Sequence, residues 1–206
     1  MGWLAESNVV GKWGADELKR LDAVPAGAFA DAALTLISVF DLINGMGVAK
    51  GDMVGNANTV KKFADGAPGK SLQELVKAEC AGKSVKEIKK IVGDGKTVTC
   101  ALLWLVRALY FILKMLEPLM ADPSKKLSEC VMAGYDVSLK PHHGFIIKGT
   151  FTVAVKAAPN RADFMKKLAD DESSIKGEID KVTPDLTKLL ASLSATLLEV
   201  TKEKAY

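Results

Sequence analysis

Four side chains at three distant places in the sequence could together bind a ligand. Asp52 and Asn56 are four residues apart, Trp104 lies within Leu-Leu-Trp-Leu, and His143 precedes Gly-Phe. Residues four apart share one face of a helix, so Asp52 and Asn56 would present an acceptor beside an amide that both donates and accepts. An indole can pack on the C–H groups of a sugar ring. With long apolar runs beside each of them, these groups suit a polyhydroxylated head group attached to an apolar tail.

Each of these residues also has a purely structural interpretation. Asp52 near the start of a helix can favour the helix dipole on a solvated face. Trp104 in an apolar helix can be ordinary core, and His143 can be an imidazole at a helix start that is hydrogen-bonded locally. Spacing alone therefore leaves both interpretations open.

The segments that contain these residues resemble the glycolipid transfer protein family. In that family an Asp-x-x-x-Asn helix face, a Trp inside a Leu-Leu-Trp-Leu helix and a His before Gly-aromatic build the sugar site. The resemblance extends over roughly residues 25 to 206. The segments that carry it are Asp52 to Asn56, Cys100 to Arg107, Ala133 to Leu139, Pro141 to Phe145 and Ala157 to Phe164.

The resemblance implies an all-α fold, a two-layer helical sandwich of about eight helices, with residues 1–206 forming a single domain. It implies a protein that binds glycolipids and transfers them between membranes without enzymatic chemistry, so that no catalytic residue, cofactor or metal is expected. The implied head-group residues are Asp52, Asn56, Trp104 and His143. His143 would bind the ceramide carbonyl, Asp52 the ceramide amide N–H, and Asn56 the sugar.

Three further residues are implied as supporting ones. Thr59 stands where the family motif continues to a Lys, which removes one strong sugar contact and leaves the head-group preference open. Arg107 matches a basic residue after the Trp and would hold Asp52 or brace the site. Tyr206 resembles a terminal Tyr that closes over the lipid in relatives.

The apolar positions predict a wall for the hydrocarbon chains and a point of membrane contact. Phe145 stands where relatives often carry Trp, and interfacial aromatic residues anchor proteins at the depth of the head groups. The proposed chain-binding residues, which also fit ordinary core, are Phe40, Ile43, Phe111, Ile147, Phe151, Val155, Phe164 and Leu168.

Composition narrows the partners and the compartment. The formal net charge is only +3 and no dense Lys/Arg block is present, so nucleic acid is a poor partner, whereas transient contact with a membrane surface fits. The three cysteines lack any Cys-x-x-Cys pairing, and the N-terminus lacks the pattern of a secretory signal. We expect a monomeric, cytoplasmic protein with reduced cysteines.

Apolar spacing of three and four residues predicts eight or nine helices and no sheet. The stretch Val98 to Met120 is the most apolar, but Arg107, Lys114 and Glu117 interrupt it, so it is predicted to be a central core helix that Pro118 ends rather than a membrane span. The other predicted helices cover residues 28–43, 51–64, 72–80, 85–92, 126–139, 142–158, 161–168 and 184–203.

Other classes of function fit less well. A ceramide 1-phosphate site would need basic residues at Asn56, Cys100 and Trp104. A lipid hydrolase would need a Gly-x-Ser-x-Gly elbow or a metal cluster, and neither pattern occurs. Three Gly-Lys-Ser/Thr fragments lack the earlier glycine of a phosphate-binding loop and are predicted to be helix starts. A glycolipid sensor with the same pocket stays open.

Overall fold

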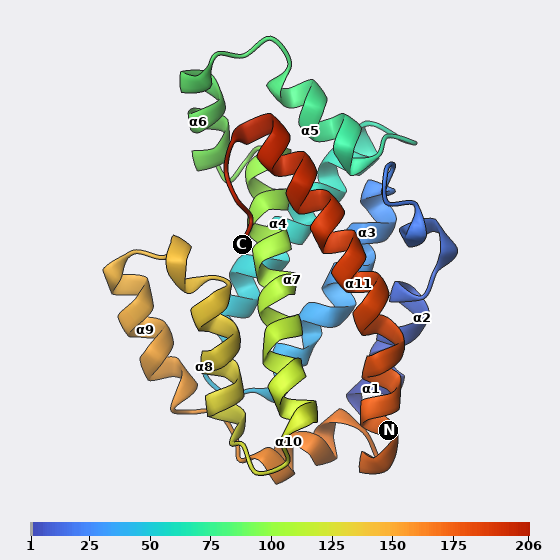
Figure 1. Ribbon diagram of the computed structural model, residues 1–206, viewed down its shortest axis with the longest axis vertical. Helices are drawn as coiled ribbons and strands as arrows, with labels where there is room; N and C mark the ends of the chain where they lie inside the picture. The colour runs from blue at the N-terminus through green and yellow to red at the C-terminus, as the bar shows by residue number, and fades with distance from the viewer. Residues whose placement is uncertain (1) are drawn as a thin grey trace.

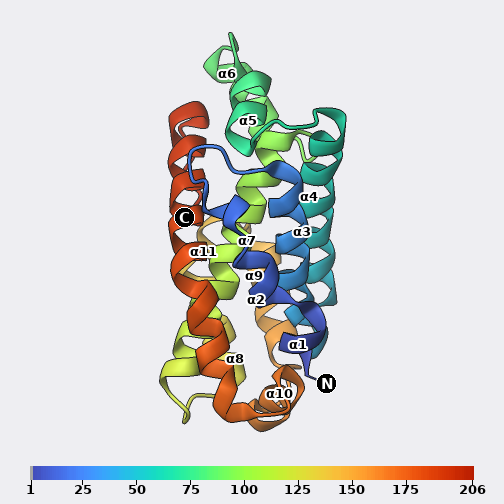
Figure 2. The same ribbon diagram turned by 90° about the vertical axis from the view of Figure 1, so that its right-hand side faces the viewer.

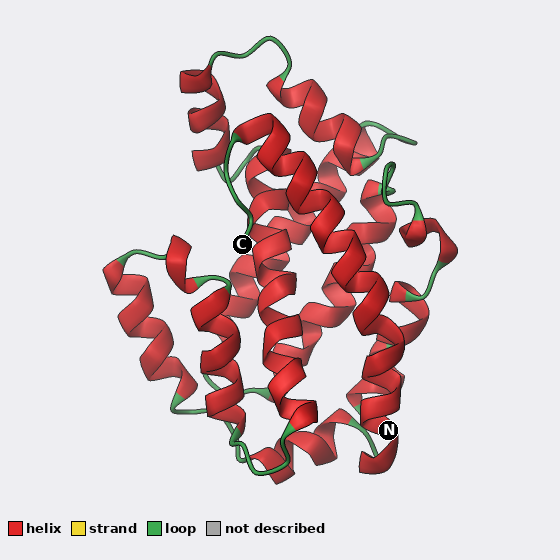
Figure 3. Cartoon of the chain, viewed as in Figure 1, coloured by secondary structure: helices red, strands yellow, loops and turns green. Residues whose placement is uncertain are grey.

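The computed structural model describes residues 2–206, and these residues form helices and connecting turns without any strand (Figures 1 and 3). This confirms the all-α prediction, although the described chain has eleven α-helices rather than about eight. Two of the additional helices are α1 and α2, short N-terminal helices that the sequence patterns did not predict. The α-helices are α1 Trp3–Ser7, α2 Val9–Trp13, α3 Ala26–Ile37, α4 Gly47–Gly66, α5 Leu72–Cys80, α6 Val85–Gly93, α7 Val98–Ala121, α8 Leu127–Val137, α9 Phe145–Val155, α10 Arg161–Leu168 and α11 Glu172–Thr201, with 3₁₀ turns at Asp16–Lys19, Ser38–Leu42 and Lys140–His142.

The long helices pack in two layers, which Figure 2 shows from the edge. Helices α7, α8 and α11 form one layer, and α3 and α4 form the other, with α1 and α2 beside them. Helix α7 contacts helices of both layers and therefore lies at the centre of the core. One continuous cluster of buried apolar side chains runs between the layers.

Helix α7 is long and apolar enough to cross a membrane, yet it is buried within the protein. In its most apolar window of 18 residues, 83% of the residues are buried. A helix that is apolar nearly all round is expected at the centre of a layered bundle. The prediction of a core helix is therefore confirmed.

The three Gly-Lys-Ser/Thr fragments begin helices, as predicted. Ser71 and Ser84 each accept a hydrogen bond from the backbone N–H three residues later, and the Glu at that position bonds back, which completes a capping box. Thr97 accepts a hydrogen bond from the N–H of Cys100 and so caps α7. These local signals place the start of α7 at Val98, six residues before Trp104.

Two prolines do not end or begin helices as predicted. Pro118 lies inside α7, which continues to Ala121, and Pro184 lies inside α11, which begins at Glu172. A proline removes one hydrogen bond within a helix. Leu119 and Leu186 are buried just after the two prolines, and we attribute the continuity of both helices to this packing.

The helix that contains the histidine segment starts later than predicted. Pro141 lies in a 3₁₀ turn, His143 has extended backbone, and α9 begins only at Phe145 after its N-cap, Gly144. His143 therefore lies in the connection between α8 and α9 rather than on a helical stripe. The helix predicted over residues 28–43 is also shorter, because the chain tightens into a 3₁₀ turn from Ser38.

Gly134 allows α8 to approach α7 closely. A Cβ atom at this position would lie 2.8 Å from the backbone nitrogen of Met115 and 2.9 Å from the carbonyl oxygen of Phe111. Only a residue without a side chain fits there. The next residue, Tyr135, is fully buried and stacks on Phe151 of α9.

Candidate functional site

Helix α4 presents Asp52 and Asn56 on one face, as their spacing predicts. The Nδ2 atom of Asn56 donates a hydrogen bond to Oδ2 of Asp52 over 3.3 Å, so the amide and the carboxylate are neighbours. Asp52 is exposed and Asn56 is half-buried. The Thr59 hydroxyl, one turn further along, donates to the carbonyl oxygen of Gly55 over 3.0 Å. Thr59 thus uses its hydrogen atom within the helix.

Trp104 is half-buried on α7 and contacts three charged or titratable side chains. The His143 ring stacks on the indole at 5.6 Å between centroids and 23° between planes, and His142 meets it edge-on at 6.4 Å. The guanidinium carbon of Arg107 lies 4.8 Å from the indole centroid. This distance is within the range of a cation–π interaction.

His143 is held by a hydrogen bond from its other side. Its Nδ1 atom lies 3.0 Å from the hydroxyl oxygen of Tyr135. Burial lowers the pKa of His143 below the ordinary value of 6.5, the nearby Asp52 carboxylate opposes this shift, and Arg107 and Lys148 add to it. The imidazole is therefore neutral at pH 7. With Nδ1 bonded to Tyr135, the Nε2 atom is the one that remains for a ligand.

Arg107 connects the site to the C-terminal segment. It is only 4% exposed, and it donates from Nε to the carbonyl oxygen of Ala205 and from Nη2 to that of Lys204, each over 2.9 Å. Its Nη2 atom also lies 4.0 Å from a Glu203 carboxylate oxygen. Burial lowers the pKa of Arg107 to about 10, so the group stays charged at neutral pH. Of the two predicted roles, the bracing one fits these contacts, because they go to the C-terminus rather than to Asp52.

Tyr206 also lies against α7. Its ring stacks on Tyr110 at 3.8 Å between centroids and 11° between planes. Together with the two hydrogen bonds from Arg107, this stack fixes the last residues of the chain beside the turn that carries Trp104. The site thus takes side chains from α4, α7, the α8–α9 connection and the C-terminal segment.

A chain of aromatic rings leads from the site into the core. Tyr135, which bonds His143, stacks on Phe151 at 3.9 Å between centroids. Phe151 contacts Phe111 at 5.8 Å, and Phe111 stacks on Phe40 at 5.6 Å. The predicted chain-binding residues from η2 (Ser38–Leu42), α7 and α9 therefore contact one another directly behind the polar residues.

Seven of the eight predicted chain-binding residues are buried, and one is not. Phe40, Ile43, Phe111, Phe151, Val155, Phe164 and Leu168 are at most 6% exposed. Ile147 is 52% exposed and lies on the outer side of α9. Phe145, the predicted membrane contact, is 92% exposed at the start of the same helix.

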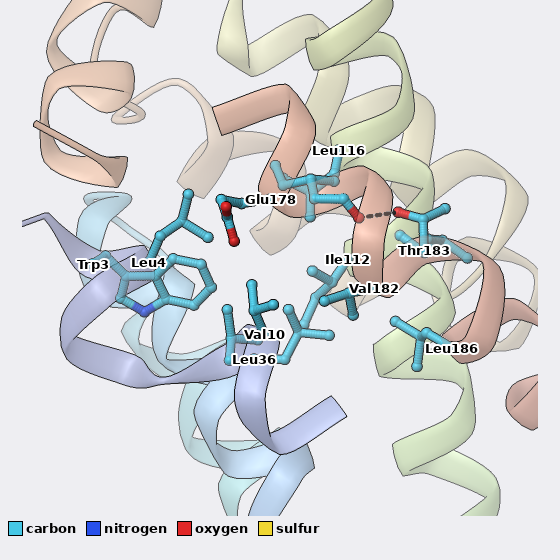
Figure 4. Close-up of a pocket in the computed structure, with 13 residues that line it drawn as sticks. Trp3, Leu4, Val10, Leu36, Ile112, Leu116, Glu178, Val182, Thr183 and Leu186 are labelled. Atoms are coloured by element: carbon cyan, nitrogen blue, oxygen red, sulfur yellow. Dashed lines mark hydrogen bonds between the residues drawn. The ribbon is translucent and has the colours of Figure 1, made fainter. Parts of the chain in front are cut away.

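An apolar recess that the sequence patterns did not predict lies between the two layers. Its volume is only about 30 Å³, and the N-terminal helices form one of its walls. Trp3, Leu4 and Val10 lie across from Ile112, Leu116 and Val182 (Figure 4). Leu36, one helical turn before Phe40, also lines it, so the recess adjoins the far end of the aromatic chain.

Tyr135 is the site residue that sequence reasoning missed. It belongs to the segment Ala133 to Leu139, which carried part of the family resemblance, but nothing in its spacing linked it to the histidine. The link arises because the 3₁₀ turn at Lys140–His142 folds the chain back and brings His143 over the end of α8. A tyrosine at the end of an otherwise apolar helix face was the only available signal.

The fold and the site together describe an all-α, two-layer protein with a cluster of polar side chains at one edge of an apolar core. A sequence profile of the glycolipid transfer protein family matches residues 24–170. A glycolipid transfer protein of Danio rerio is 31% identical over 188 residues, which cover 86% of this chain and 87% of the relative. The chain therefore belongs to the glycolipid transfer protein family.

Solved structures agree with this assignment and confirm the two-layer fold. HET-C2, a fungal glycolipid transfer protein, superposes with a TM-score of 0.74 at 32% identity and covers 87% of this chain and 88% of its own. A variant of Arabidopsis ACD11 complexed with a ceramide-1-phosphate superposes with a TM-score of 0.81 at 18% identity, over 97% of this chain and 96% of its own. At that identity the second likeness concerns the fold alone.

Proposed function

We propose that this protein binds a glycolipid and carries it between membranes without making or breaking a bond. The sugar lies against Trp104, with Asp52 and Asn56 as its hydrogen-bonding partners, and the Nε2 atom of His143 binds the amide-linked part of the lipid. The observation that carries this proposal is the stack of Trp104 and His143 beside the Asp52–Asn56 pair, at the entrance to a chain of buried rings.

The energetics of lipid desorption explain why such a carrier is useful. Moving one methylene group from a bilayer into water costs about 0.8 kcal/mol, so a lipid with roughly 16 methylenes per chain faces a barrier of at least about 10 kcal/mol. An apolar interior replaces the bilayer around the chains, and the site replaces water around the head group. Net transfer then follows the concentration gradient and needs no nucleotide.

The hydrocarbon chains enter between the layers, and side chains there have to move. Phe40, Phe111 and Phe151 contact one another and are nearly inaccessible. A chain that enters therefore displaces one or more of these rings, and it reaches the adjoining recess beside Leu36. Because the ligand binds only the folded state, its binding raises the free energy of unfolding.

We also propose that α9 is the membrane contact. Phe145, Ile146 and Val153 are at least 66% exposed on its outer face, and Val48 at the start of α4 is 85% exposed. Gly45, which precedes α4, approaches the carbonyl oxygen of Ala154, so these two segments are adjacent. A patch of this kind, next to the site, inserts at the depth of the lipid head groups.

The side chains of this site suit a sugar head group better than a phosphate. ACD11, whose solved complex contains a ceramide-1-phosphate, shares the fold. In this chain, however, Asn56, Cys100 and Trp104 are uncharged, and Arg107 is bonded to the carbonyl groups of the C-terminal segment. A phosphate requires charge-assisted donors that are free to reach it.

The proposal is tested by transfer of labelled glucosylceramide between neutral phosphatidylcholine vesicles. Replacement W104A removes the indole, and we expect the rate of transfer to fall by at least roughly tenfold, which corresponds to about 1.4 kcal/mol. The control is L105A, because Leu105 is fully buried on the same helix, so its truncation lowers stability without removing a site residue. Unchanged transfer by W104A, or an equal loss in both variants, would refute the role of Trp104. A wild-type protein that extracts glycolipid but does not accelerate net exchange would be a sensor.

We propose that the protein acts as a single domain in the cytoplasm. One apolar core connects the helices from α1 to α11, which supports the single domain. Cys80, Cys100 and Cys130 are free and buried, which supports a reducing compartment. The monomeric state stays a prediction.

A further inference from the structure

Helix α6 and the turns beside it carry a cluster of lysines that the proposed site does not use. Residues 83–96 contain five lysines and two acidic residues, so their net charge of +3 equals the formal net charge of the whole chain. The rest of the protein is therefore electrically neutral in sum. We call Lys83, Lys86, Lys89, Lys90 and Lys96 the α6 lysine cluster; all five are exposed.

The α6 lysine cluster is unpaired within the described residues 2–206. Nine other lysines form ion pairs, for example Lys50 with Asp41 and Lys114 with Glu117, but none of the five in the cluster does. The two acidic residues of the segment bind elsewhere. Glu87 completes the capping box of α6, and Asp94 accepts a hydrogen bond from the backbone N–H of Lys96. The positive charge is thus available to a partner.

The helix that carries the cluster also exposes apolar surface. None of the residues of α6 is fully buried; Ile88, Ile91 and Val92 are half-buried, and Val85 is 70% exposed. Lysines beside exposed apolar side chains on a short amphipathic helix are typical of a segment that lies in the interface of a membrane with anionic lipids. A nucleic-acid site would instead place aromatic residues among the basic ones, and residues 83–96 contain no aromatic residue.

The position of α6 fits the same partner. Figure 1 shows α6 and α9 projecting from the same side of the molecule, at the left of the view, with the C-terminal segment between them. The end of α6 is joined directly to the helix that carries Trp104, because the Thr97 hydroxyl donates to the carbonyl oxygens of Ile91 and Asp94 and also caps α7. One approaching surface can therefore meet the apolar face of α9 and the lysines of α6 on either side of the site.

We propose that the α6 lysine cluster binds acidic lipid head groups and thereby orients the site toward anionic membranes. This inference rests on the proposed function, because it concerns the membrane at which the protein takes up or releases its lipid. The two helices of this docking surface then have different roles. Helix α9 inserts into the apolar boundary of any bilayer, whereas the lysines of α6 bind only where the bilayer carries negative charge. The charge of the membrane then selects where loading and unloading are fast.

The test measures binding of the full chain to vesicles of two compositions. One set is phosphatidylcholine alone and the other contains 20 mol % phosphatidylserine. Each lysine near such a surface contributes roughly fivefold to binding at low salt, so K86Q/K89Q/K90Q is expected to weaken binding to the anionic vesicles by roughly 100-fold. Binding to the neutral vesicles is expected to stay within about twofold. Gln and Lys have similar helix propensities, so α6 should remain folded.

The matched control is K12Q/K166Q/K167Q, which removes the same charge elsewhere. Lys12, Lys166 and Lys167 are exposed, form no ion pair within residues 2–206, and lie on α2 and α10. This variant is expected to keep most of the preference for anionic vesicles, and 0.5 M NaCl is expected to remove the preference in the wild type. Equal weakening by both triple variants would overturn the proposal, because it would show that only total charge matters.

Two further outcomes separate this proposal from its alternatives. If soluble polyglutamate binds the wild type as tightly as the anionic vesicles do, with the same dependence on the three lysines, the cluster is a protein-binding surface and the proposal fails. Glucosylceramide transfer between neutral vesicles is measured on the same variants. If vesicle binding depends on the lysines but no transfer occurs, the proposed transfer function is refuted and the lipid-binding role of the α6 lysine cluster is supported. If transfer occurs but vesicle binding does not depend on the lysines, the transfer function is supported and the role of the cluster is refuted.

Discussion

Replacement of Tyr135 by Phe tests whether the hydrogen bond to His143 prepares the site. The hydroxyl lies 3.0 Å from Nδ1 of His143, and the phenyl ring of the variant keeps the stack on Phe151. The change therefore removes one hydrogen bond and leaves a partly buried ring nitrogen without its partner, which costs about 1–3 kcal/mol. For a protein of this size, each kcal/mol lowers the melting temperature by roughly 2–4 °C.

The same variant is expected to lose function by a separate route. When the hydroxyl donates to Nδ1, the neutral imidazole carries its proton on Nε2 and can donate to a lipid carbonyl. Without it, the two tautomers interconvert and the ring rotates, so we expect glucosylceramide transfer to fall by roughly fivefold to tenfold, or about 1 kcal/mol. Nitrogen-15 NMR of the His143 ring reports the tautomer directly, and vesicle assays report transfer.

Tyr110 supplies the matched control. It is another tyrosine that stacks on a ring, here that of Tyr206, but its hydroxyl forms no hydrogen bond within residues 2–206. Y110F is therefore expected to change neither the His143 tautomer nor the transfer rate. The reasoning is refuted if Y135F keeps the wild-type tautomer and transfer rate, or if both variants lose transfer to the same extent.

Three other predictions concern packing, charge and pH. Gly134→Ala is expected to lower the free energy of unfolding by about 1–3 kcal/mol, because its Cβ would meet the α7 backbone. Gly149 lies in open space on α9, so Gly149→Ala should be neutral or stabilising by up to about 1 kcal/mol. Denaturant titration of both variants measures the difference. Arg107→Gln is expected to cost about 2–3 kcal/mol and to release the C-terminal segment, which faster cleavage by carboxypeptidase would reveal and unchanged cleavage would contradict. Because burial lowers the pKa of His143, the unfolded state binds more protons than the folded state below pH 6.5. The contribution of neutral His143 to the free energy of unfolding is therefore fully present above pH 6.5 and is lost as the pH falls through the folded pKa. In melting curves from pH 7 to 5, H143Q should depend less on pH than the wild type.

Features that depend on neighbouring residues were predictable from the sequence. The serine and threonine caps of α5, α6 and α7 identify where those helices begin, because the bonds involved span three residues. The Asp52–Asn56 pair follows from the i, i+4 geometry of a helix in the same way. The family resemblance supplied the remaining site residues, Trp104 and His143, which periodicity alone would have assigned to the core or to a helix end.

Features that depend on packing between distant segments were not predictable. The bonds from Arg107 to Lys204 and Ala205 join residues almost a hundred positions apart, so no local pattern shows them. The apolar recess needs α1 and α2, whose few residues give no clear period. Pro118 and Pro184 look like helix boundaries locally, and both helices run on through them because the residues that follow are buried in the core.

The surroundings of Trp104 make it an internal optical reporter. The chain has three tryptophans, and Trp3 and Trp13 are buried in the N-terminal helices. Trp104 alone lies against an imidazole and a guanidinium group, both of which influence indole emission. A ligand that inserts beside the indole would change its emission spectrum, whereas Trp13, which does not line the recess that Trp3 and Leu36 share, would stay constant. Occupancy can therefore be followed by intrinsic fluorescence in real time, without attaching a dye to the protein or to the lipid.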